Sequence, residues 1–124
     1  MRRGRSLTAV SSALALFGLL VALTASALAA SGKIIYSFQG GSDGAFPYSD
    51  LVADAARNLY GTTSQGGTGC NGQGCGTVFE LVRANDGWKH LVLYSFAGAS
   101  DGSFPQAGLV FDSAGNLYGT ATWG

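Results

Sequence analysis

The sequence predicts an all-β protein of antiparallel four-stranded repeats resembling propeller blades, preceded by an N-terminal signal helix. Three observations lead to this fold class. A block of sequence recurs after 58 residues, the segments between its turns are rich in Val, Leu, Tyr and Phe, and 20 of the 124 residues are glycine. Many glycines with only two prolines are typical of tight turns between short strands. Beyond the signal segment, no stretch follows the 3.6-residue period of a helix.

The N-terminal segment has the organisation of a secretory signal peptide. Three of its first five residues are arginine, and the 25 residues from Ser6 to Ala30 carry no charge. A short apolar core precedes Ala27-Leu28-Ala29, which supplies small residues at the −3 and −1 positions of a signal-peptidase site. We therefore expect residues 1–29 to be removed by cleavage after Ala29, leaving 30–124 as the β-repeat region. The alternative is a retained anchor, because an uncharged run of this length could span a bilayer.

Charge and composition narrow the classes of partner. The whole chain has a formal net charge of zero, and the part after Ala29 has four basic against seven acidic residues, a net charge of −3. Without a basic surplus, nucleic acid is not expected as a partner. An aromatic content of 11% argues against disorder. We expect a secreted, periplasmic or cell-surface protein with no membrane contact after signal cleavage.

The internal repeat organises the rest of the chain. Residues 36–66 align with 94–124 without a gap, and 19 of the 31 aligned positions are identical. The first copy therefore covers 36–93, and 94–124 is an incomplete second copy, about one and a half copies in all. A unit of roughly 40–60 residues with four antiparallel strands is typical of a β-propeller blade.

The first two strands of a unit are clearest in the second copy. Segments 108–112 and 116–120 are rich in β-formers and flank a turn that ends at Gly115, where a positive φ is easily adopted. In the first copy Arg57 takes the place of Gly115. We expect this replacement either to cost stability or to change the type of turn.

The last two strands are expected at 76–82 and 88–96, joined by the polar turn 83–87. Four aromatic side chains fall on the expected strands, and the simplest interpretation is packing between blades. They are Tyr60, Phe79, Phe96 and Tyr118.

Two cysteines lie close together in a glycine-rich loop. In an exported chain, Cys70 and Cys75 predict a disulfide, which would stabilise the fold by about 2 kcal/mol on the chain-entropy model. The alternative is a metal site, but two cysteines with His90 as the only histidine make a poor zinc set. We expect neither a metal nor a cofactor.

Three short motifs resemble functional sites but fit turns better. The G-x-G-x-x-G match at 67–72 leads into a strand and not into the helix that would bind a phosphate. The G-x-S-x-G matches around Ser42 and Ser100 recur with the repeat and precede Phe-Pro, so we interpret Ser-Asp-Gly as a turn and not as a nucleophile elbow. Asp43 and Asp101 could contribute to a Ca²⁺ site, although one carboxylate per loop is few for that ion.

Three other side chains are candidates for ligand contact or catalysis. His90 lies in an expected strand and is interpreted as an exposed or rim histidine and not as a base. Trp88 and Trp123 are expected to be partly exposed, where they could stack on a sugar ring or simply pack. No catalytic residue is predicted.

One family resemblance accompanies these patterns. Asn-Leu-Tyr-Gly-Thr at 58–62, then a glycine-rich stretch and Gly-Thr-Val-Phe-Glu-Leu at 76–81, resembles the GloVer tandem repeat of exported bacterial choice-of-anchor proteins. The resemblance covers 34–124 and implies many repeats per chain, a propeller-like all-β fold and a cell-surface or extracellular location. The family carries no established catalytic residues. This chain has fewer than two repeats and no visible C-terminal anchor.

That difference leads to an expectation about completeness. A blade needs neighbours to cover both its faces, and repeat proteins usually need three or more units. We expect a truncated gene product or a fragment. The rival is a complete short protein that shares blades between chains as a homo-oligomer.

Two classes of function remain. The favoured one is an exported, non-enzymatic repeat protein acting as a surface or interaction scaffold for an unknown protein or glycan ligand, since no titratable cluster suits catalysis. The alternative is part of a propeller-type glycan-binding protein or carbohydrate-active enzyme whose site needs further blades.

Overall fold

The computed structural model describes residues 31–124, so the predicted signal helix and the cleavage position at Ala29 lie outside the described residues. Residues 34–124 form one unit that is predominantly β-structure. The helical content of the described part is one turn of 3₁₀ helix, η1 (Cys70–Gly72). No helix between residues 31 and 124 has the length and apolarity to cross a membrane.

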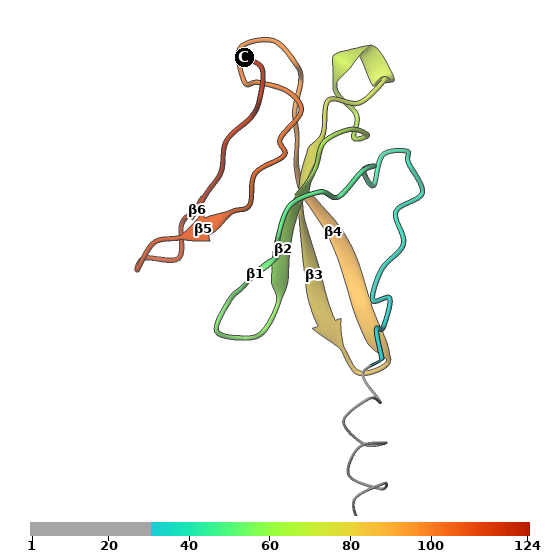
Figure 1. The fold of residues 1–124 in the computed structure, drawn as a ribbon, viewed down its shortest axis with the longest axis vertical. Coiled ribbons are helices and arrows are strands. Elements are labelled where there is room, and N and C mark those ends of the chain that lie inside the picture. Colours follow the sequence, from blue (N-terminus) through green and yellow to red (C-terminus); the bar gives the residue numbers. More distant parts are fainter. Residues whose placement is uncertain (1–30) are drawn as a thin grey trace, which may run out of the picture. The chain divides into compact units, whose positions relative to one another are not determined.

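A four-stranded antiparallel sheet forms the centre of this unit (Figure 1). Its strands follow each other in chain order, so that every strand pairs with its sequence neighbour. The all-β class and the antiparallel four-stranded sheet predicted from the sequence are therefore confirmed. The strands are β1 (Val52–Ala53), β2 (Leu59–Thr63), β3 (Thr77–Ala84) and β4 (Gly87–Ser95).

Strand β3 alternates in burial because one of its faces is covered more completely than the other. Phe79 and Leu81 on one face are 2% and 3% exposed, while Val78 and Glu80 on the other face are half-buried. Towards β4 the pairing shifts by one residue between Val78 and Phe79, which leaves Leu93 as the extra residue of a β-bulge.

The first two strands of the unit recur in the second copy. Strands β5 (Val110–Phe111) and β6 (Leu117–Tyr118) pair as a two-stranded antiparallel sheet. Val110 opposes Tyr118 in the same register in which Val52 opposes Tyr60, with each residue shifted by 58 positions. The sequence repeat is thus also a repeat of strand register.

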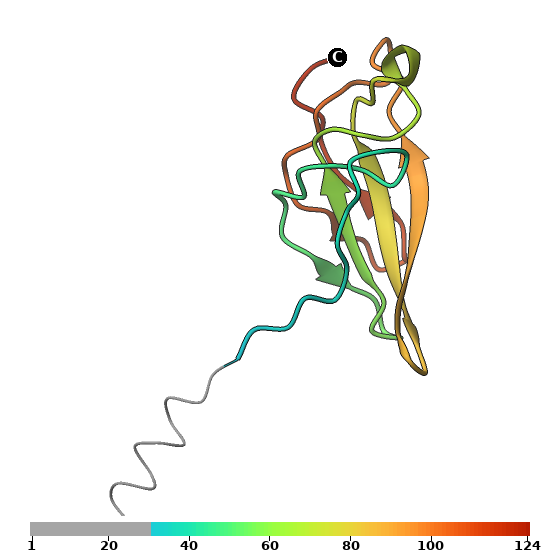
Figure 2. The same cartoon turned by 90° about the vertical axis from the view of Figure 1, so that its right-hand side faces the viewer.

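The core lies on the two faces of β2 and β3. Residues 35–51 pass over one face, where the rings of Phe38 and Phe79 meet edge to face with centroids 5.0 Å apart. The second copy lies on the other face, where Tyr60 meets Phe111 in the same way at 5.1 Å. Figures 1 and 2 show the early segment and the second copy on opposite sides of the sheet.

Candidate functional site

The two Ser-Asp-Gly segments form the same hydrogen-bonded turn. In the first copy Asp43 Oδ2 accepts hydrogen bonds from the Gln39 N–H and the Tyr36 hydroxyl, each at 2.9 Å. In the second copy Asp101 Oδ2 accepts from the Ala97 N–H at 2.9 Å and the Tyr94 hydroxyl at 2.6 Å. The glycine after each aspartate has a positive φ of 110° or 91°. The interpretation of Ser-Asp-Gly as a turn therefore agrees with the structure.

A second aspartate turn joins the first two strands of each copy. Asp54 accepts from the Asn58 backbone N–H at 2.9 Å and from the Asn58 side-chain amide at 3.0 Å. Asp112 accepts the same two bonds from Asn116, both at 2.8 Å. In each copy the tyrosine two residues further on completes the set, with its hydroxyl 3.0 Å from the aspartate Oδ2.

These hydrogen bonds hold the carboxylates in their ionised form. The Tyr94 hydroxyl and the Ala97 N–H lower the pKa of Asp101 below its usual value, and the Asn116 side chain and N–H do the same for Asp112. Partial burial acts to raise the pKa of Asp43, but the Gln39 N–H and Tyr36 hydroxyl outweigh it. A carboxylate with a lowered pKa is a poor general acid at neutral pH.

The serines of the G-x-S-x-G matches sit on exposed turns. Ser42 and Ser100 are both exposed, and neither turn leads into a helix. The imidazole of His90 stacks on Tyr36 with ring centroids 4.4 Å apart and lies 5.4 Å from the ring of Phe38. The histidine is therefore engaged in an aromatic cluster and not oriented by a serine.

Of the exposed and rim positions that the sequence leaves open for His90, the structure gives the rim position. It is half-buried and not exposed, because it lies on the face of β4 that also carries the neighbours of Phe79, whose ring is 5.6 Å away. Burial lowers the pKa of His90, and the nearby Asp43 carboxylate acts in the opposite direction. Its Nε2 atom is buried and has no hydrogen-bond partner among the described residues.

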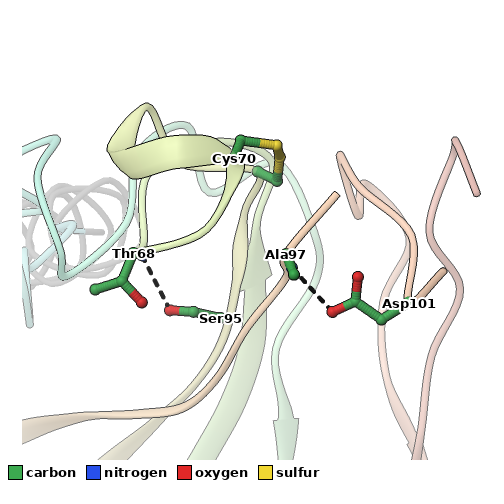
Figure 3. Close-up of a disulfide and its surroundings, with 6 residues drawn as sticks. Thr68, Cys70, Ser95, Ala97 and Asp101 are labelled. Carbon is green, nitrogen blue, oxygen red and sulfur yellow. Dashed lines mark hydrogen bonds between the residues drawn. A yellow bond between two sulfur atoms is a disulfide. The ribbon is translucent and has the colours of Figure 1, made fainter. Parts of the chain in front are cut away.

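The glycine-rich loop is closed by a disulfide between Cys70 and Cys75, as the sequence predicts. The loop is fastened to the connection between the copies, because the Cys70 N–H donates to the Ala97 carbonyl at 3.2 Å. The Thr68 N–H also donates to Ser95 Oγ at 3.3 Å (Figure 3). The sulfurs pack against Gly98, where an added Cβ would be 2.6 Å from the Cys75 sulfur. The disulfide-closed loop thus packs against the segment that connects the two copies.

Beside this loop lies an open hollow walled mainly by backbone. Side chains enter it from Ser42, Thr68 and Gln73, and the remainder of its lining is glycine from the two turns. Two of its backbone N–H groups are already used, since Gly40 donates to Gly44 and Gly67 donates to Gly41. The hollow is a polar surface without a charged side chain among its lining residues.

The two tryptophans are partly exposed, as expected. Trp88 is half-buried and lies under the guanidinium of Arg83, whose Cζ is 5.1 Å from the ring centroid. Trp123 is 66% exposed. Its backbone pairs with that of Ser103 in an isolated β-bridge. Trp123 is therefore the tryptophan with a ring face available for a ligand.

Sequence reasoning missed a buried threonine network. Thr63 and Thr77 are fully buried, their hydroxyls are 2.8 Å apart, and the Thr77 N–H donates to Thr63 Oγ1 at 3.1 Å. Thr62 donates across to the Ala107 carbonyl of the second copy at 3.3 Å. The signal was present in the adjacent threonines of Leu-Tyr-Gly-Thr-Thr, but β-strand threonine alone does not reveal which face will be covered.

Within residues 31–124 no group of three or more His, Cys, Asp or Glu side chains is placed to hold a metal ion. In comparisons with known proteins, the chain matches no family model, no curated protein and no solved structure.

Proposed function

We propose that this chain is an exported, non-enzymatic repeat protein that serves as a surface or interaction scaffold, built from propeller-blade-like units of the GloVer type. One observation carries the proposal. The aspartates and tyrosines that recur between the copies make the same turn bonds twice, at Asp43 and Asp101 and again at Asp54 and Asp112. The recurring aspartates accept these bonds from groups within seven residues of themselves, so we infer that they serve architecture and not chemistry.

The proposed blade arrangement is supported by the packing of the two copies. The sheet of the first copy is covered on one face by the second copy, through Thr62 and the Tyr60–Phe111 contact. Blade-like units stack in this face-to-face manner, and each repeat contacts mainly its neighbours.

The proposed export is supported by the disulfide. A short loop closed by Cys70 and Cys75 is typical of proteins that fold in an oxidising compartment. Expression of the full chain in a bacterium with a periplasm tests this part. We expect the mature protein to begin at Ala30 by intact mass, with the disulfide formed. An unprocessed chain with free thiols in the cytoplasm would contradict export.

A glycan array separates the scaffold from the alternative of a glycan-binding or carbohydrate-active propeller. The specific observation in favour of that alternative is the exposed ring of Trp123. We expect no reproducible signal above that of the Trp123→Ala variant. Reproducible binding that is lost in Trp123→Ala would overturn the pure scaffold and establish the glycan-binding alternative.

A further inference from the structure

The disulfide loop contains the one asparagine of the sequence that is followed by glycine. Asn71 and Gly72 lie in the 3₁₀ turn η1, and both are exposed. At such a pair the backbone nitrogen of the glycine can attack the side-chain amide carbon of the asparagine, because no Cβ shields that nitrogen. Apart from the chain neighbours, no heavy atom lies within 4 Å of the position that a Cβ of Gly72 would take. The fold therefore leaves the reactive nitrogen unshielded.

The other asparagines are held by a partner or followed by a larger residue. The side-chain amides of Asn58 and Asn116 each donate to the aspartate of their own turn, at 3.0 and 2.8 Å, and leucine follows both. Asn85 is exposed, but its successor is Asp86 and not glycine. Among residues 31–124 Asn71 has no such aspartate partner, and its side chain is exposed. Asn71 thus combines a free amide with an unshielded successor.

Hydrogen bonds within the loop restrain the nitrogen of Gly72. Its N–H donates to the Gly69 carbonyl at 3.0 Å, and the Gly74 N–H donates to the same carbonyl at 3.0 Å. The attack requires the Gly72 nitrogen to lose its proton and to approach the amide carbon, so the bond to Gly69 opposes it. The disulfide between Cys70 and Cys75 limits the opening of this turn. The loop therefore exposes the reactive pair and slows its reaction.

We propose that Asn71 is a deamidation site whose rate is controlled by the Cys70–Cys75 disulfide. The Gly72 nitrogen forms a bond to Asn71 Cγ, the Cγ–Nδ2 bond breaks, and Nδ2 leaves as ammonia with the proton that the Gly72 nitrogen gave up. Water then opens the cyclic imide. Cleavage of the bond between the nitrogen and Cγ gives aspartate, and cleavage of its bond to the backbone carbonyl carbon gives isoaspartate.

Both products change the loop. A carboxylate replaces a neutral amide, so a negative charge appears beside the hollow that Gly72 and Gln73 help to line and that has no charged side chain in its lining. Isoaspartate also lengthens the backbone within the disulfide-closed loop. The N–H groups of Gly72 and Gly74 then no longer match the Gly69 carbonyl, and we expect hydrogen exchange to accelerate at both.

The test is incubation of the intact, disulfide-bonded chain at mildly alkaline pH, followed by peptide mapping. Trypsin places Asn58 and Asn71 in the peptide 58–83, Asn85 in 84–89 and Asn116 in 90–124, and fragment ions separate the first two. We expect the mass gain of deamidation at Asn71 first, with both aspartate and isoaspartate as products. Reduction of the disulfide at the same pH should accelerate it by about threefold or more, because the turn opens more often.

A matched pair of glycine variants identifies the nucleophile. Gly72 and Gly115 have φ of 84° and 83°, and an added Cβ meets nothing within 4 Å at either, so alanine brings similar backbone strain to both. Gly72→Ala should slow deamidation of Asn71 about tenfold, because the methyl group shields the nitrogen and restricts the backbone. Gly115→Ala should leave the rate unchanged. If Gly72→Ala fails to fold, Asn71→Gln decides, since its longer side chain would have to close a larger ring and the mass gain in 58–83 should disappear.

Three results would overturn the proposal. One is deamidation of Asn71 that is no faster than that of Asn85, and another is an equal effect of Gly72→Ala and Gly115→Ala. The third is the same rate in the disulfide-bonded and the reduced chain, which would remove the control by the disulfide. The inference goes beyond the proposed function, because it needs neither export nor a surface role, and no result of the glycan array bears on it.

Discussion

At the scale of single residues, equivalent positions of the two copies can be compared directly. Arg57 and Gly115 occupy the same turn position, and both adopt a left-handed backbone, with φ of 68° and 83°. Both N–H groups donate to the aspartate three residues earlier. The turn type is therefore unchanged by the arginine, and the remaining expectation from the sequence, a cost in stability, stays a prediction.

Replacing Arg57 with glycine should raise the free energy of unfolding by about 0.5–1 kcal/mol. An L-residue in the left-handed region costs about 1–2 kcal/mol, and the greater freedom of glycine in the unfolded chain offsets part of this. Urea denaturation measures the difference. The reciprocal change Gly115→Arg should lower stability by a similar amount, and equal stabilities of all three proteins would contradict the argument.

His90 should make stability depend on pH near neutrality. Burial lowers the pKa of His90 in the folded chain, so the folded state favours the neutral imidazole. The stabilisation is fully present above the usual pKa of 6.5 and is lost as the pH falls through the lowered value, because the unfolded chain then binds more protons. Asp43 and Asp101 have lowered pKa values and stay ionised throughout this window.

Thermal unfolding between about pH 8 and pH 5 tests the titration of this histidine. We expect Tm to fall with pH in the natural chain and to change less in His90→Leu, which keeps an apolar side chain beside Phe38 and Phe79. A pH dependence that is the same in both proteins would show that another group is responsible.

At the scale of elements, strands and turns follow local patterns closely. The four strands of the first copy lie where runs of β-forming residues between turns predict them, and the turn between β3 and β4 narrows to Asn85-Asp86. The Ser-Asp-Gly turns could equally be predicted, because donor and acceptor lie within seven residues of each other. The aromatic packing of His90 could not be predicted, since it depends on Tyr36 and Phe38, more than fifty residues earlier.

Removing the disulfide should loosen the glycine-rich loop. The double variant Cys70→Ala/Cys75→Ala should lose about 2 kcal/mol of unfolding free energy on the chain-entropy model. Hydrogen exchange should accelerate most at Cys70 and Thr68, whose N–H groups fasten the loop to Ala97 and Ser95. Reduction of the natural chain is the control and should have the same effect. Unchanged exchange in the loop would mean that its glycine turns suffice.

At the scale of the whole molecule, equivalent positions in the two copies have different surroundings. Leu51 is 45% exposed and Leu109 is 7% exposed, although the two are identical in the repeat. The difference arises because Leu109 faces Thr62 of the four-stranded sheet, whereas Leu51 borders the face covered by residues 35–38. We therefore expect the same leucine to contribute different amounts to the free energy of unfolding in the two copies.

Truncating each leucine measures this asymmetry. Leu109→Ala should lower the free energy of unfolding by about 2–4 kcal/mol through lost burial and a cavity, while Leu51→Ala should cost about 1 kcal/mol or less. Urea denaturation of both variants gives the comparison. Similar losses would indicate that the two copies do not pack on each other as described.

The sequence by itself determined the period of 58 residues, the strand order of a unit, the turns and the cysteine pair. These features depend on residues close together in the chain, such as an aspartate and the N–H groups of its own turn. Only the tertiary structure decided that His90 lies half-buried in an aromatic cluster and that Leu109 and Leu51 differ in exposure. The reason is physical: burial is a property of segments brought together from distant parts of the chain, and a local pattern shows which side chains are apolar without showing what covers them.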